Sequence, residues 1–126
     1  MDMSDNEEEE EQYFAGYYNI WFNDMIVHTE YFLLEEYEEE SYIIKQIRRK
    51  HKEDVKQFGK SNYAIEIFDE RTYPINENIN EIKSVLEDEL EIQKDMISKL
   101  SNQEKEQRKE KFLNMDTMFS ALDNIL

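Results

Sequence analysis

The stretch "HTEYFLLEEYEEESYIIKQIRRK", residues 28–50, places large apolar side chains among glutamates and then becomes basic. Its apolar residues recur at steps of three, four and seven, the spacing of one helix face: Leu33, Tyr37, Ile44 and Ile47. On such a helix the intervening glutamates face water. The stretch therefore predicts an amphipathic helix with an acidic outer side.

The same spacing extends in both directions, from Phe14 to Phe58. It predicts one long helix or two helices broken near residues 27–30, with Gly59 as a C-cap. Gly16 is the one weak residue inside this segment. The whole chain has only two glycines and one proline, which favours long helices because turns consume both residue types.

The second half of the chain shows three further patterns. Apolar and polar residues alternate over 63–68, which favours a short extended segment. Asn76, Asn78 and Asn80 offer N-caps for a following helix, and Ser101 with Glu104 matches a capping box. A heptad-like seam lies between these caps: Ile82, Leu86, Leu90, Gln93, Ile97 and Leu100.

These patterns predict an all-α fold, in which a long N-terminal helical segment packs antiparallel on one or two C-terminal helices. The chain is expected to form a single domain over residues 1–126, with residues 1–10 as an acidic tail. The alternative is an elongated coiled coil that forms a homodimer through its seam: Leu86, Leu90, Ile97 and Leu100.

Composition argues against an enzyme. The chain has no cysteine and therefore no thiol nucleophile or thiolate metal site. Its two histidines, His28 and His51, are far apart in sequence and lack a paired ligand motif. No Gly-rich phosphate loop is present. We therefore expect no catalytic residues, no metal site and no cofactor.

The charge is unevenly distributed along the chain. Residues 1–40 contain fourteen of the 31 acids and none of the fifteen bases, so they carry −14 of the formal net charge of −16. A basic run follows over residues 45–60, but a salt-bridging helix end explains it better than nucleic-acid binding. The acidic third would repel a phosphate backbone, so direct binding of nucleic acid is not expected.

Acid interleaved with tyrosine predicts a protein-binding surface, since carboxylates can imitate DNA phosphates and aromatics dominate protein interfaces. The expected function is to inhibit or sequester a basic, nucleic-acid-binding protein. The expected contact residues are Tyr31, Glu35, Glu36, Tyr37, Glu38, Glu39, Glu40 and Tyr42. The alternative is a structural subunit of a larger assembly whose acid only confers solubility. With no membrane-length apolar run and no basic leader, an intracellular location, cytoplasmic or nuclear, is expected.

Overall fold

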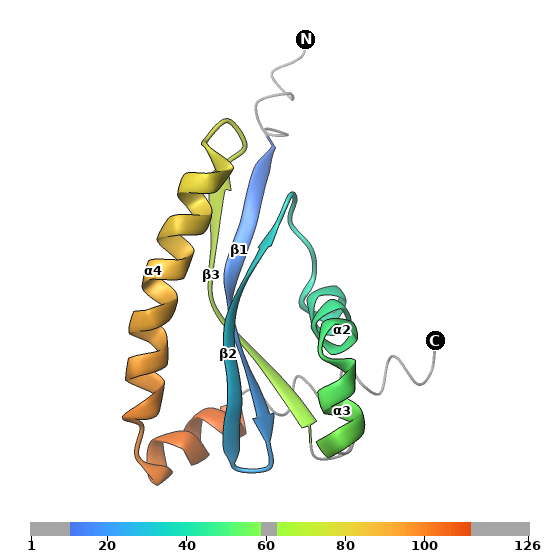
Figure 1. The fold of residues 1–126 in the computed structure, drawn as a ribbon, viewed down its shortest axis with the longest axis vertical. Coiled ribbons are helices and arrows are strands. Elements are labelled where there is room, and N and C mark those ends of the chain that lie inside the picture. The colour runs from blue at the N-terminus through green and yellow to red at the C-terminus, as the bar shows by residue number, and fades with distance from the viewer. Residues whose placement is uncertain (1–10, 59–62, 112–126) are drawn as a thin grey trace.

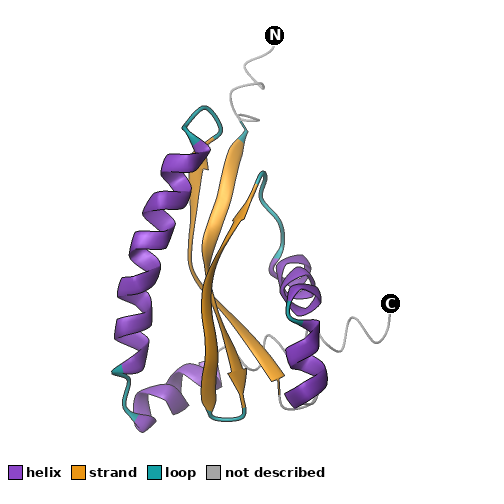
Figure 2. Ribbon diagram, in the orientation of Figure 1, coloured by secondary structure: helices purple, strands orange, loops and turns teal. Residues whose placement is uncertain are grey.

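The computed structural model describes residues 11–58 and 63–111. It is an α+β fold, so the all-α prediction is wrong (Figures 1 and 2). The order of elements is β1 (Gln12–Phe22), β2 (Met25–Leu34), α2 (Glu40–Lys50), α3 (Lys52–Phe58), β3 (Tyr63–Pro74) and α4 (Ile79–Ser98). Residues 102–111 are also helical. No helix in the described ranges is long and apolar enough to cross a membrane.

The three strands form one antiparallel sheet in the order β2-β1-β3. Helix α4 runs along one face of this sheet, and α2 and α3 lie on the other (Figure 1). Each face has its own apolar core. Ile43, Ile44 and Ile47 of α2 pack on one side, and Ile82, Leu86 and Leu90 of α4 pack on the other.

The central position of β1 explains why its sequence was mistaken for a helix. Tyr18 and Ile20 face α2, whereas Ala15 and Tyr17 face α4, and all four are buried. A strand buried on both sides reads as a continuous apolar run, which contains the helical steps of four as well as steps of two. The aromatic and branched composition of "QYFAGYYNIWF" is typical of strands.

A tight turn separates β1 from β2 inside the predicted long helix. Residues 23 and 24 form it, and Asn23 has a φ of 56°. Asn tolerates this left-handed conformation better than most residues. The scarcity of glycine and proline therefore did not exclude a hairpin, because Asn supplied the turn instead.

Gly16 is needed for close packing. A Cβ at this position would lie 2.9 Å from the ring of Phe32 and 3.3 Å from the Cα of Glu70. The β1–β3 register shifts between Ala15 and Tyr17, where Asp69 on β3 has a φ of 53°. This irregularity has the features of a β-bulge, with an extra residue on β3.

Helix α4 confirms part of the sequence reading and corrects part of it. Asn78 is its N-cap and accepts a hydrogen bond from the backbone N–H of Asn80. The seam residues Leu86 and Leu90 are buried against the chain's own sheet. The coiled-coil prediction is therefore wrong, because this face of α4 already has a partner within the chain.

Two other local predictions are confirmed. The backbone N–H of Glu104 donates to Ser101 Oγ at 3.1 Å, and the backbone N–H of Ser101 donates to the Glu104 carboxylate at 2.9 Å, the reciprocal pattern of a capping box. The extended segment near 63–68 is real and continues as β3 to Pro74. The proposed cap at Gly59 lies outside the described residues.

Residues 28–50 are thus a strand, a loop and a helix rather than one helix. Leu33 packs on the α4 side of the sheet, while Ile44 and Ile47 are buried on the α2 side. Tyr37, expected to face the core, lies in the loop with 67% of its surface exposed. The helical spacing across this stretch was therefore coincidental before residue 40.

Candidate functional site

An open hollow of about 600 Å³ lies at the end of the sheet where β1 begins and β2 ends. We call it the acidic hollow and define it by its lining residues: Glu11, Gln12, Tyr13, Glu35, Glu36, Tyr37 and Ile75. Three of these are carboxylates and two are tyrosines, and no lysine or arginine is among them. Its composition favours a cationic ligand.

The register of the hairpin brings the two halves of the acidic hollow together. Phe14 on β1 pairs with Leu34 on β2 in the antiparallel ladder. Residues 11–13, just before Phe14, therefore lie beside residues 35–37, just after Leu34. The chain beyond β3 closes the third side, because the Ile75 backbone N–H donates to the Glu11 carbonyl at 3.3 Å.

Tyr37 is exposed but anchored. Its ring packs edge-on against Phe14, with ring centroids 5.0 Å apart and planes at 62°. Phe14 is itself 4% exposed and belongs to the core on the α2 side. Such a contact holds one face of the tyrosine in place and reduces the entropy that binding a ligand would otherwise cost.

Glu39 and Glu40, which follow the lining residues 35–37 in sequence, lie at the start of α2. Glu39 is the N-cap residue, and its carbonyl accepts from the backbone N–H groups of Tyr42 and Ile43. Glu40 lies in the first turn, where the helix dipole favours a negative charge. Burial, and secondarily the charge of Glu70, raises the pKa of Glu40.

The predicted contact residues do not form a single surface. Glu35, Glu36 and Tyr37 line the acidic hollow. Glu38, Glu39 and Glu40 continue the chain into α2 without lining it, and Tyr42 is 43% exposed on α2. Tyr31 is on the α4 side of the sheet, where its hydroxyl donates to Glu87 at 3.4 Å.

Sequence reasoning missed Glu11, Gln12, Tyr13 and Ile75. The signal that could have found the first three was the turn at Asn23, because a hairpin centred there pairs residues near 13 with residues near 35. Ile75 depends on the pairing of β1 with β3. In the sequence these strands are separated by β2, α2 and α3, so no local pattern indicates their contact.

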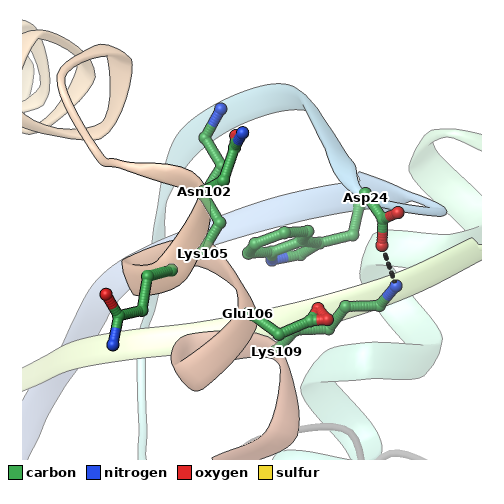
Figure 3. A pocket seen from close by; sticks show the side chains of 7 residues that line it. Asp24, Asn102, Lys105, Glu106 and Lys109 are labelled. Carbon is green, nitrogen blue, oxygen red and sulfur yellow. Dashed lines mark hydrogen bonds and ion pairs between the residues drawn. The ribbon is translucent and has the colours of Figure 1, made fainter.

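A second hollow, of about 520 Å³, lies under the helical residues 102–111 beside the β1–β2 turn (Figure 3). Asp24 and Glu106 line it together with Lys105 and Lys109. Lys109 Nζ lies 2.6 Å from Asp24 Oδ1, so one charge of each sign is already paired. With balanced charges this hollow selects no sign of ligand, unlike the acidic hollow.

The acidic hollow offers only oxygen ligands and a glutamine amide. Imidazole and carboxylate atoms come together elsewhere in the described part of the chain, at His28, His51 and Asp54.

No protein-family model, curated protein or solved structure matches the chain.

Proposed function

We propose that the protein binds a basic segment of another protein at the acidic hollow, and that it acts by occupying that segment. The observation that supports the proposal is the convergence of Glu11, Glu35, Glu36, Tyr13 and Tyr37 around one open hollow. Carboxylates attract lysine and arginine, and tyrosine faces accept both cations through cation–π contacts.

The free energies of the available contacts indicate how large the ligand has to be. An exposed ion pair contributes about 0.2–1 kcal/mol, and an exposed cation–π contact about 0.5–1 kcal/mol. Even when all three carboxylates and both tyrosines are engaged, they supply about 2–5 kcal/mol, which corresponds to a dissociation constant between about 0.2 and 30 mM. A single lysine side chain is therefore too small a ligand. A partner has to present several cations at once.

The acids that neighbour the lining residues in sequence also favour a polybasic ligand. The first ten residues, which precede Glu11 in the chain, contain six acids and no base. Glu77 and Glu81 follow Ile75 in sequence and are exposed. A surface whose charges are all negative increases the association rate with a basic partner, and this increase becomes smaller as the salt concentration rises.

The proposal can be tested with a synthetic peptide of alternating lysine and arginine, measured by fluorescence anisotropy at low and moderate salt. The test variant is the double substitution Glu35→Gln and Glu36→Gln. The matched control is Asp88→Asn with Glu91→Gln, which removes two exposed charges from α4. Tyr37→Ala tests the aromatic contribution separately.

We expect the acidic-hollow variant to bind the peptide at least several-fold more weakly than the α4 control. Equal weakening by both double variants would show that net charge, and not the acidic hollow, attracts the peptide. That result would contradict the proposal.

A further inference from the structure

A separate cluster lies on the face of the sheet that α2 and α3 cover, where these two helices meet. His28 comes from β2, His51 follows directly after α2, and Asp54 belongs to α3. One ligand atom from each lies within 4.8 Å of the other two. We propose that these three residues bind one Zn²⁺ ion.

The separations suit an ion of this size. Asp54 Oδ2 lies 2.9 Å from His28 Nε2 and 3.7 Å from His51 Nδ1. Ligands about 2.1 Å from a tetrahedral Zn²⁺ lie about 3.4 Å from one another, a value between these two distances. The ligand atoms of all three residues lie within 4.8 Å of one another, so side-chain rotation would bring them to one ion.

The choice of atoms is also consistent with metal binding. His51 points Nδ1 toward Asp54, and its Nε2 lies 2.9 Å from the Tyr18 hydroxyl. A histidine that binds a metal through one ring nitrogen usually donates a hydrogen bond from the other, which fixes the tautomer and the ring orientation. Tyr18, which is 1% exposed on the central strand, is placed to accept that hydrogen bond.

The cluster is also accessible. The side chains of His28 and Asp54 are 39% and 30% exposed, while that of His51 is 13% exposed. Metal can therefore enter from the His28 side, and water can complete the coordination. Two histidines and one carboxylate leave at least one position open, as in zinc sites that exchange a ligand.

The alternative is that the three residues form only hydrogen bonds that hold α2 and α3 on the sheet. Both accounts place Asp54 between the two histidines, so stability measurements alone would not separate them. Binding of one metal ion per chain would separate the two explanations, provided that the many exposed carboxylates are prevented from binding the metal. Excess Mg²⁺ does this, because it prefers oxygen ligands and does not compete for imidazole.

The test uses the full-length chain without an affinity tag, in excess Mg²⁺. Co²⁺ is titrated by visible absorption and then displaced by Zn²⁺, which binds such sites more tightly. We expect one equivalent of Co²⁺ to bind, and one of Zn²⁺ to displace it. Tyr18→Phe should change the Co²⁺ spectrum and weaken binding by about 10- to 100-fold, and Asp54→Asn should weaken it more.

The matched control is Glu53→Gln, which neutralises the neighbouring exposed carboxylate on α3. It should bind Co²⁺ like the unaltered protein. His28→Gln provides a second ligand variant at the most exposed of the three positions, and far-UV circular dichroism without metal checks that each variant folds. Absence of one-equivalent binding would overturn the proposal, as would equal binding by the Glu53→Gln protein and the folded ligand variants.

Discussion

Glu66 is a buried carboxylate on the α4 side of the sheet, with only 6% of its surface exposed. Its Oε1 accepts from Asn19 Nδ2 and from Trp21 Nε1, each at 3.0 Å. Its Oε2 lies 2.6 Å from Arg108 Nε. One side chain therefore connects β3, β1 and the helical residues 102–111. A buried charge is tolerated only when it is paired and hydrogen-bonded in this way.

We expect Glu66→Gln to lower the free energy of unfolding by about 1–3 kcal/mol, because the buried Glu66 position loses its charge-assisted contact with Arg108, whose side chain is 29% exposed. The measurement is chemical denaturation. Glu70→Gln, at an exposed position on the same strand, serves as the control and should change stability by less than about 0.5 kcal/mol. Similar values for the two variants would mean that the Glu66 network does not hold the helical residues on the sheet.

At the scale of elements, the decisive feature is the β1–β2 hairpin. The sequence pattern over residues 14–34 permits both a helix and a pair of strands, because buried residues occupy both faces of β1. The turn at Asn23 distinguishes these two structures experimentally, since Asn23 is exposed and has a positive φ.

Asn23→Gly should leave stability unchanged or raise it, because glycine adopts the left-handed conformation without strain. Asn23→Val should lower stability by about 1–2 kcal/mol, because a branched side chain is strained there. Thermal and chemical denaturation check both variants. In a helix the order would differ, with glycine destabilising by about 1 kcal/mol, so a stable valine variant and an unstable glycine variant would contradict the hairpin.

Helix caps and short extended segments could be predicted from the sequence, whereas the pairing of distant strands could not. An N-cap among Asn76, Asn78 and Asn80, the Ser101 capping box and the extended segment near residue 63 were predicted because each depends on a few adjacent residues. Strand pairing depends on residues about 50 positions apart, such as Ile20 with Ile65. The candidate site divides in the same way. Glu35, Glu36 and Tyr37 are neighbours in sequence, but Glu11 and Tyr13 join them only through the hairpin.

At the scale of the whole molecule, buried tyrosines make the fold sensitive to alkali. Burial raises the pKa of Tyr17 and of Tyr63 to about 12, and it also raises the pKa of Tyr18. In the unfolded chain the pKa of tyrosine is about 10. The folded state thus favours the neutral phenol, so this contribution to stability is complete below pH about 10 and is lost as pH rises through about 12.

We therefore expect the protein to unfold between pH about 10 and 12, with buried phenols ionising as structure is lost. Phenolate absorbance and far-UV circular dichroism, followed on the same sample, check this. Tyr17→Phe should remove one late-ionising phenol from the titration. Full ionisation of every tyrosine with the sheet still intact would show that the phenols are not protected by the fold.

We propose that the acidic hollow, and not the total charge of −16, recognises a basic segment. Amide chemical-shift mapping of the isotope-labelled protein with the lysine–arginine peptide tests this most directly. We predict that the largest shifts are confined to residues 11–13, 35–37 and Ile75, and that they diminish as salt rises. Shifts of similar size along the exposed acids of α4, including Asp88 and Glu91, would contradict the claim.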